Sequence, residues 1–585
     1  MQFEHEGNRT FQRIVLVALT LLSGLMFLRL GQFSIIQSSG WKDRTEKRIC
    51  RTLKIEPKRG RIFAGDGRTI LAESDLALSI AVDNCAIRGT NNECKIGNRL
   101  AEIIGEPPET VISKIHSRHN AEWLARDVDR QVYKHFSKVQ LDGLLPGVHI
   151  KREMHRIYPH HPDAASLLGF VSFKREPGFD TLGPYRHGRG IEGIERAYDK
   201  ELRGEFGECR YQVNRFYAPE HDTFETIKEV KDGYDLVTTV DLKLQSLVRE
   251  ELLKGLELNA ADVAMAMILD PYTGAILAAE SVENMPEHKD RDYRESTAVN
   301  CWPSAARRNQ TFTSVFEPGS IWKPVMMSIA LENNLVYDGE IIPWKPAIVM
   351  GGHAFRDWKN FNRDLELKEV LIWSSNVGII EVSRKMFNTM PDGQIFDQLQ
   401  GMGFLRPLPV DSPVRPRGIL NPGNWSPITV GAVAEGYETS VTMSQLGAFY
   451  CAIANGGNIV HPHYGEKLLD PETGETVRNL TPEEGYPIMS PETAAFIKNA
   501  MTECVDYGTG KKGNLKDYRI EAAGKTATAK LLVNGSIDPD GVSYIVITDD
   551  DDWTDGISGD IFFAGDVAEG ESFSASRANA GASFS

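Results

Sequence analysis

The stretch FEPGSIWKP, residues 316–324, decides how the largest part of this chain is expected to fold. Its Pro-Gly pair interrupts the chain, and the apolar run from Val325 to Leu331 that follows predicts a largely buried helix. Pro324 fits the start of such a helix, because the first helical N–H groups have no intrahelical partner. We therefore expect Ser320 and Lys323 to lie on its first turn.

Ser320 and Lys323 have the spacing of a nucleophile and its base. Positions i and i+3 share a helix face, which predicts that the lysine amine lies beside the hydroxyl. Burial and the positive helix N-terminus favour a neutral lysine, and the same dipole favours a developing serine alkoxide. The pair therefore predicts an activated nucleophile, although the spacing alone is weakly specific and recurs at Ser39 and Lys42.

Two further motifs make the pattern specific. The segment WSSNVG, residues 373–378, interrupts two apolar helical segments and is expected to place Ser374 and Asn376 in a buried loop. The segment GKTATA, residues 524–529, lies in an expected strand of small residues and holds the only Lys-Thr dipeptide of the chain. The order S-x-x-K, S-x-N, K-T-x is that of the penicillin-recognising serine enzymes.

Composition bounds the remaining possibilities. The chain has 585 residues, a net charge of −16 and 41 % hydrophobic residues, which indicates roughly two to four domains with proper cores. A disordered chain, a collagen-like fibre and a polytopic membrane protein are excluded, and the acidic balance gives no electrostatic reason to expect nucleic-acid binding. Seven cysteines without a CxxC pair argue against a zinc or iron–sulfur site, and only Cys85 and Cys94 are close enough to suggest a local disulfide.

An apolar segment near the N-terminus, residues 14–36, predicts a membrane anchor. It is long enough to cross a hydrocarbon core of roughly 30 Å, with Arg29 near one face. The alternative is a cleaved signal peptide with the small residues 38–40 as its cleavage site. More basic residues follow the segment than precede it, so the positive-inside rule alone does not place the bulk of the chain outside.

The chain divides near residue 235. The earlier half is expected to consist of short strands and loops, and it offers no constellation of catalytic residues; its expected strands are Lys54–Phe63, Thr69–Leu71 and Leu76–Val82. The later half is expected to begin with a strand at Leu236–Val240, a helix at Leu242–Leu258 and an apolar hairpin of Val263–Leu269 with Ala275–Ala279. Long helical stretches are expected between residues 320 and 460, and strand character returns at Arg519–Val533. Strands at both ends imply an α+β domain whose sheet closes late through non-local pairing.

Together these motifs resemble those of the class B penicillin-binding proteins, which are membrane-anchored peptidoglycan D,D-transpeptidases. The resemblance covers residues 14–530 and extends to PKRGRI (57–62) with Leu71-Ala72, GIERAYD (193–199) with Leu202-Arg203-Gly204, TVD (239–241) with Gln245, DPYTG (270–274), Arg308-Asn309, and GYE (436–438) leading to ANGG (454–457). It implies an α+β fold in which a single transmembrane helix is followed by a β-rich pedestal and a penicillin-binding/β-lactamase-like transpeptidase domain, an antiparallel sheet with helices. The expected segments are a cytoplasmic tail (1–13), the anchor (14–36), the pedestal or dimerisation-type domain (45–232), the transpeptidase domain (233–537) and an atypical acidic tail (538–585).

The resemblance also implies a role for each motif residue. Ser320 would attack the carbonyl between the two terminal D-alanines of a stem peptide, and Lys323 would take its proton. Ser374 and Lys525 would relay that proton to the leaving D-alanine, while Asn376 would orient Lys323 and the substrate amide. In the strand, Thr526 and Thr528 would bind the substrate carboxylate around Ala527, and the N–H groups of Ser320 and Thr528 would form the oxyanion hole.

The same resemblance implies partners and a location. Expected ligands are peptidoglycan stem peptides and β-lactams, with no metal or organic cofactor and no nucleic acid. Expected protein partners are those of a division or elongation complex, including a glycosyltransferase, with a division-type role favoured. The bulk of the chain would lie outside the cytoplasmic membrane of a bacterium, held by a single pass.

Two departures from the family pattern leave alternatives open. Ala527 stands where the family carries glycine, so its methyl is either accommodated or crowds the ligand against the strand edge. After the third motif the family continues with two strands and a packing helix. Here residues 543–548 and 561–564 are the only strand candidates after residue 537. Residues 538–585 contain eleven acidic residues and one basic residue. The enzyme could therefore be weakened or inactive.

Three other functions compete with transpeptidation. A catalytically impaired scaffold of the wall-synthesis machinery would fit the departures, and a β-lactam-hydrolysing or β-lactam-sensing protein shares the motifs but does not call for the long pedestal. A nucleotide-binding protein is suggested by two glycine-containing segments. GTGKKG, residues 508–513, is a lone G-x-G-x-x-G without a preceding strand, and GKT, residues 524–526, lacks the leading glycine of a P-loop because Arg519 occupies that position.

Overall fold

A computed structural model of the chain describes residues 2–32, 49–87, 92–117, 121–125, 147–175, 186–213, 220–259, 261, 263–283, 309–420, 425–529, 532–533, 536–537, 542–549 and 560–566. The chain forms two compact units. One consists of Met1–Pro57 with Gly204–Asp232, and the other of Lys58–Arg203 with Gly233–Ser585.

The first unit contains the N-terminal helix and a small sheet. Helix α1 (Gln2–Gly31) includes the segment Arg13–Gly31, which has a mean hydropathy of 2.2 and the length of a membrane span, as expected for the anchor. Positions 33–36 of the expected anchor lie outside the described residues. Strands β1 (Cys50–Ile55), β8 (Gly207–Gln212) and β9 (Glu225–Lys228) form an antiparallel sheet in that order.

In the second unit, one long strand replaces the two strands expected between Thr69 and Val82. Strand β3 (Ile70–Asp83) continues through the polar residues 73–75 and pairs with β5 (Val148–Ile157) along ten residues. The expectation of a break was wrong because the polar interruption is satisfied across the strands: buried Ser74 accepts a hydrogen bond of 3.2 Å from Arg156.

Two amphipathic helices were not predicted in this part of the chain. Helices α4 (Glu93–Ile104) and α5 (Pro108–Ile115) bury one face each against β3 and β4 (Ala121–Ala125), around a small separate core. Cys94 on α4 is a free thiol, so the suggested Cys85–Cys94 disulfide is not formed.

A second sheet brings early and late segments of this unit together. Its order is β21 (Thr476–Asn479), β20 (Gly465–Leu469), β10 (Asp235–Thr238), β2 (Ile62–Phe63), β3 and β4. Strands β2 and β10 run parallel, and the carboxylate of Asp235 accepts hydrogen bonds from the backbone N–H and the guanidinium of Arg61.

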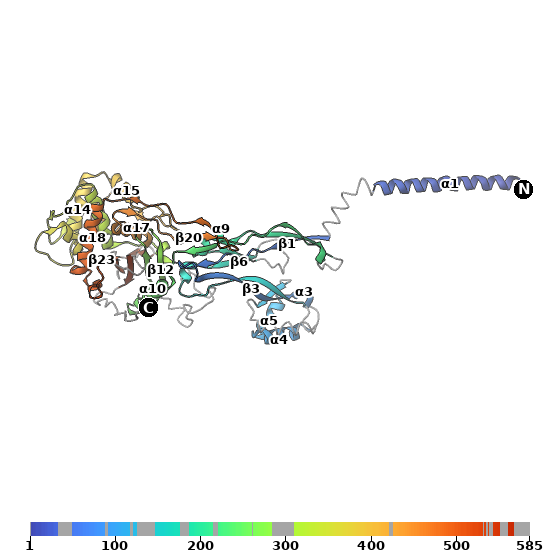
Figure 1. The fold of residues 1–585 in the computed structure, drawn as a ribbon, viewed down its shortest axis with the longest axis horizontal. Coiled ribbons are helices and arrows are strands. Elements are labelled where there is room, and N and C mark those ends of the chain that lie inside the picture. The colour runs from blue at the N-terminus through green and yellow to red at the C-terminus, as the bar shows by residue number, and fades with distance from the viewer. Residues whose placement is uncertain are drawn as a thin grey trace. The chain divides into compact units, whose positions relative to one another are not determined.

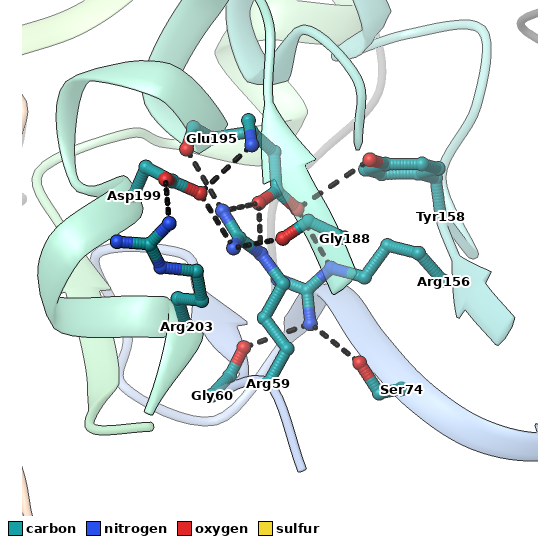
Figure 2. A network of polar contacts seen from close by, with 10 residues as sticks. Arg59, Gly60, Ser74, Arg156, Tyr158, Gly188, Glu195, Asp199 and Arg203 are labelled. Carbon is teal, nitrogen blue, oxygen red and sulfur yellow. Dashed lines mark hydrogen bonds and ion pairs between the residues drawn. The ribbon is translucent and has the colours of Figure 1, made fainter. Parts of the chain in front are cut away.

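A buried ionic network joins two segments of the early half that are far apart in the sequence. Figure 2 shows Glu195 between two guanidinium groups: Arg59 Nε donates to one carboxylate oxygen at 2.7 Å and Arg156 Nε to the other at 2.6 Å. Arg59 also donates to Asp199 at 2.8 Å. Although burial alone raises the pKa of Glu195, the two arginines hold that pKa below its usual value. The signatures at 57–62 and 193–199 therefore meet in one structural cluster.

The predicted α+β domain is confirmed in the later half. Helix α10 (Leu242–Leu258) follows β10, and strands β11 (Val263–Leu269) and β12 (Ile276–Glu283) form the predicted hairpin. The antiparallel sheet has the order β12-β11-β27-β26-β23, with β23 at Ala522–Ala529, β26 at Val542–Asp549 and β27 at Asp560–Asp566. The late strand candidates thus complete this sheet through non-local pairing, and residues 567–585 lie outside the described part.

Both faces of that sheet are covered by helices (Figure 1). On β11, Ala264, Ala266 and Ile268 pack with α10, whereas Met265 and Met267 face the main core. That core includes buried residues of α12 (Lys323–Glu332), α14 (Asn376–Thr389), α17 (Met443–Ala454) and α18 (Pro491–Asp506). Alternation along β11 therefore sets the sheet between two apolar layers.

Candidate active site

The nucleophile turn begins as a 3-10 helix rather than as the first turn of an α-helix. Gly319–Trp322 forms the 3-10 segment, and α12 starts at Lys323. Because side chains three residues apart eclipse in a 3-10 helix, Ser320 and Lys323 still share a face. The turn is fixed from behind by the buried Tyr450, whose hydroxyl donates to Ile321 O at 2.9 Å.

A close backbone contact supports the same turn. Gly319 N donates to Gly436 O at 3.0 Å, and a Cβ atom on Gly436 would lie 2.1 Å from Gly319 O. Gly436 also has a φ of 90°, which side chains other than glycine rarely allow. The glycine in the GYE segment is therefore explained by the approach of the two turns.

Lys323 is completely buried and makes three hydrogen bonds to the S-x-N loop. Its Nζ atom lies 2.6 Å from Ser374 O, 2.6 Å from Asn376 Oδ1 and 3.2 Å from Ser374 Oγ. Asn376 Nδ2 donates to Arg356 O at 3.1 Å, which turns the amide oxygen of Asn376 toward the lysine. No hydrogen bond joins Ser320 to Lys323 in the described chain, so the amine is held by the second motif and not by the nucleophile.

The loop between α13 (Leu367–Ile372) and α14 has an unusual backbone conformation. Ser374 has a φ of 52°, a left-handed geometry that costs energy for a residue with a side chain. Ser375 caps α14 by accepting from Gly378 N at 2.8 Å, and it donates to Asp357 Oδ2 at 2.9 Å. This conformation presents both the carbonyl and the hydroxyl of Ser374 to the lysines.

Asp357 is a site residue that the sequence reasoning missed. Its Oδ1 atom accepts from Asn376 N at 2.5 Å and from Val377 N at 3.1 Å, and its Oδ2 atom also accepts from Trp344 Nε1 at 2.8 Å. A carboxylate at a helix N-terminus is stabilised by the exposed N–H groups and by the dipole. Because Asp357 lies in an irregular segment 19 residues before Asn376, no local pattern marks it.

Strand β23 brings the third motif to the same place. Lys525 is 1 % exposed, and its Nζ atom donates to Ser374 Oγ at 2.8 Å and to Thr526 O at 2.9 Å. The Thr526 hydroxyl lies 2.8 Å from that of Thr509, a second residue that was missed. Ala527 is 7 % exposed and belongs to the main core. The backbone of Thr528 pairs with Ser543, and its side chain lies outside the description.

The electrostatics of the site favour a neutral Lys323. Burial lowers its pKa to about 7, with repulsion by Lys525 as the second cause, while Glu435 and Asp357 act in the opposite direction. Burial also lowers the pKa of Lys525 to about 8. The sequence predicted that burial favours the neutral form of Lys323, and the lowered pKa agrees with that prediction in direction.

Counting donors shows what a neutral Lys323 can do. A neutral amine has two N–H donors and one lone pair, and two of its contacts, Ser374 O and Asn376 Oδ1, can only accept. Both N–H groups are thereby used, and the lone pair is left to accept a proton. The Ser374 hydroxyl, which accepts from Lys525, lies 3.2 Å from the same amine, so it can exchange a proton with Lys323 once the lone pair has been protonated.

The structure therefore joins Lys323, Ser374, Asn376 and Lys525 by hydrogen bonds, with Ser320 on the same turn as Lys323 and Thr526 to Thr528 on the strand of Lys525. Ser39 and Lys42, the repeat of the S-x-x-K spacing, lie outside the described residues. Among the described residues, no three His, Cys, Asp or Glu side chains gather in a way that could hold a metal ion.

Comparison with known proteins agrees with this arrangement. Residues 54–238 match the Penicillin-binding Protein dimerisation domain, and residues 264–548 match the Penicillin binding protein transpeptidase domain. Residues 517–585 also match a Domain of unknown function (DUF7467), which overlaps the end of the transpeptidase match.

Similar proteins include two curated relatives and a solved structure. The chain is 26 % identical to Stage V sporulation protein D of Bacillus subtilis (strain 168), over 90 % of this chain and 78 % of the relative. It is 28 % identical to Peptidoglycan D,D-transpeptidase FtsI of Escherichia coli (strain K12), over 92 % and 84 %. The crystal structure of Penicillin Binding Protein 2X from Streptococcus thermophilus shares the fold with a TM-score of 0.66 at 18 % identity, over 89 % and 78 %.

The two matched domains, with the three motifs assembled around buried lysines, define a penicillin-binding protein with a transpeptidase domain. The chain belongs to the class B penicillin-binding proteins.

Proposed function

We propose that this chain is a serine D,D-transpeptidase that cross-links peptidoglycan stem peptides through an acyl-enzyme on Ser320. The observation that carries the proposal is the Ser374 hydroxyl shared by two buried lysines, 2.8 Å from Lys525 Nζ and 3.2 Å from Lys323 Nζ. Such a chain of groups can accept a proton from a nucleophile and deliver it to a leaving group. The relatives named as D,D-transpeptidases support the same reaction.

In the acylation step, Ser320 Oγ attacks the carbonyl carbon between the two terminal D-alanines while Lys323 takes the hydroxyl proton. Collapse of the tetrahedral intermediate breaks the C–N bond, and the proton passes by way of Ser374 to the leaving D-alanine. Lys525 keeps its proton, holds the Ser374 hydroxyl in place for this relay by donating to its oxygen, and faces the substrate carboxylate with its positive charge. An amine of a neighbouring stem peptide then attacks the ester, releases Ser320 and forms the cross-link.

Substrate binding is assigned to the edge of β23. Hydroxyl groups of Thr526 and Thr528 bind the substrate carboxylate, and the N–H groups of Ser320 and Thr528 stabilise the oxyanion. Asn376 orients the substrate amide as well as Lys323. β-Lactams acylate Ser320 through the same contacts.

Two observations bear on the alternative of a catalytically impaired scaffold. The late strands β26 and β27 complete the sheet that carries Lys525, which supports an active enzyme. The second observation is the DUF7467 match across residues 517–585, which names no activity and overlaps the segment that carries Lys525. Labelling membranes with a fluorescent penicillin separates the two: an active site gives a labelled band that competes with unlabelled penicillin, and a scaffold gives none.

We also assign residues 45–232 to a non-catalytic pedestal, residues 233–537 to the transpeptidase domain and α1 to a single-pass anchor in a bacterial cytoplasmic membrane. The substrate lies outside the cytoplasm, so the chain after α1 does as well. A reporter that is active only outside the cytoplasm should therefore be active when fused after residue 240, and deletion of residues 1–36 should release the protein from membranes. Activity of a cytoplasm-only reporter at that position would contradict the assignment.

The chemistry of cross-linking fits partnership with a glycosyltransferase in a division or elongation complex, because a cross-linker must receive newly polymerised glycan strands. We favour a division-type role on the length of the chain and the plain character of its pedestal. Co-purification from cross-linked cells, followed by identification of the associated glycosyltransferase, tests this assignment.

A further inference from the structure

The glycine-rich segment at 508–513, which the nucleotide-binding alternative rested on, lies beside the assembled site. It follows α18, and its Thr509 hydroxyl is 2.8 Å from the Thr526 hydroxyl of β23. On its other side, Thr509 Oγ1 is 3.3 Å from the Sγ atom of Cys504, which is completely buried. Three proton-bearing side chains thus form a continuous row that ends at the proposed carboxylate-binding residue.

The backbone of the same residue is attached to the second motif. Thr509 N donates to Ile372 O at 3.2 Å, and Ile372 ends the helix that leads into Ser374. Gly508 allows this approach, since a Cβ atom there would lie 2.5 Å from Ile372 O. Thr509 therefore contacts both motifs: its backbone N–H binds the helix that leads into the S-x-N segment, and its hydroxyl binds the K-T-x strand.

The directions of the hydrogen bonds among Cys504, Thr509 and Thr526 indicate what this row of side chains can do. A hydroxyl has one proton, and an ionised carboxylate can only accept. If Thr526 gives its proton to the substrate carboxylate, its oxygen must accept from Thr509. The Thr509 oxygen is then left to accept from the thiol of Cys504. A bound carboxylate therefore orients all three protons the same way, and each hydrogen bond strengthens the next one.

We infer that Thr509 is a positioning residue for carboxylate recognition, which sets the Thr526 hydroxyl as a donor and is itself supported by Cys504. The inference rests on the proposed function, because it assigns a ligand carboxylate to Thr526. It adds a specificity determinant from outside the three motifs. The ligand class is an acyl-D-alanyl donor, or a β-lactam, whose leaving side carries a carboxylate.

The test compares two N-acyl-D-alanyl thioesters that differ only in the leaving group. One leaving thiol ends in a carboxylate and the other in the uncharged carboxamide. In both, Ser320 Oγ bonds to the D-alanyl carbonyl carbon, the C–S bond breaks, and the released thiol is measured by its colour reaction. The ratio of the two kcat/KM values reports carboxylate recognition separately from the chemistry at the carbonyl.

Thr509→Val keeps the shape and the backbone N–H but removes the hydroxyl. We expect kcat/KM for the carboxylate thioester to fall about tenfold and that for the carboxamide to change less than twofold, because only the charged ligand uses the donor. Thr509→Ser restores a hydroxyl and should restore the ratio. Cys504→Ser, which keeps a donor, should lie closer to the unsubstituted protein than Cys504→Ala. Thermal melting of each full-length variant in detergent checks the fold.

An equal loss on both thioesters in a normally melting Thr509→Val variant, or no loss on either, would overturn the inference while leaving the proposed function standing. The same holds if the unsubstituted protein cleaves both thioesters at equal rates. If the unsubstituted protein cleaves neither thioester and takes up no penicillin, the proposed function fails, and the inference fails with it.

Discussion

Lys525 donates a hydrogen bond of 2.8 Å to the hydroxyl of Ser374, a residue 151 positions earlier in the chain. The same hydroxyl lies 3.2 Å from Nζ of Lys323, so one side chain connects the two buried amines. The proposed proton transfer between the nucleophile and the leaving group therefore requires three separate segments to be held together: α12, the loop before α14, and β23.

The pH dependence of acylation follows from the two lysine pKa values. Lys323 must be neutral to accept a proton, and its pKa of about 7 makes the neutral fraction rise as the pH rises through 7. Lys525 must be protonated, and its pKa of about 8 means that this charge is lost above pH 8. The rate of penicillin acylation should therefore be bell-shaped with a maximum between these values. A rate that keeps rising toward pH 10, where an ordinary lysine titrates, would contradict the assignment of the base.

Replacing Lys525 should affect both the rate and the pH profile. We expect Lys525→Ala to slow acylation at least about tenfold, or about 1.4 kcal/mol of barrier. Because Lys525 repels the proton on Lys323, its removal should also move the rising limb of the profile to higher pH. The exposed Lys512, from the loop after α18, serves as a matched control, and Lys512→Ala should leave both unchanged. Unchanged acylation in a normally melting Lys525→Ala variant would exclude β23 from the site.

Asp357 should prove to be a positioning residue. Asp357→Asn turns part of the carboxylate into a donor facing the N–H groups of Asn376 and Val377, so we expect a loss of about 1 to 3 kcal/mol in the free energy of unfolding. The negative charge also raises the pKa of Lys323, so its removal should shift the rising limb of the acylation profile to lower pH. Asp397→Asn, an exposed control on α15 (Asp392–Gly401), should do neither. If the Asp357→Asn variant is less stable but its pH profile of acylation is unshifted, Asp357 only caps helix α14 and does not influence Lys323.

The buried methyl of Ala527 favours the view that it is accommodated. Its 7 % exposure and place in the main core predict that Ala527→Gly lowers stability by about 1 to 2 kcal/mol, through lost packing and a more flexible strand. The acylation rate should stay within about twofold. A several-fold acceleration, measured with the same fluorescent penicillin, would instead support crowding of the ligand by the methyl.

Local patterns were sufficient for the parts of the site that lie within continuous elements. The spacing of Ser320 and Lys323 survives the change from an α-helical to a 3-10 turn, because both geometries place i and i+3 on one face. Helix α10 and strand β11 have the bounds that periodicity predicts, since their apolar faces are regular.

Contacts made by isolated polar residues could not be predicted in this way. Asp357 and Thr509 reach the site from loops, and their partners are determined by the tertiary fold rather than by sequence spacing. The wrong expectation at Ser74 has the same cause. The polar residues within β3 predicted a break between two strands, but Arg156 of the neighbouring strand donates a hydrogen bond to the Ser74 hydroxyl.

Locating the penicillin adduct tests the central claim most directly. Full-length protein in detergent is labelled with penicillin, digested and analysed by mass spectrometry, with Ser320→Ala as the matched variant. We predict an adduct on the peptide that contains Ser320 and none in the variant, because among the described residues only Ser320 shares a turn with a buried lysine that is joined to the other two motifs. An adduct on Ser39, or one that persists in Ser320→Ala, would contradict the account.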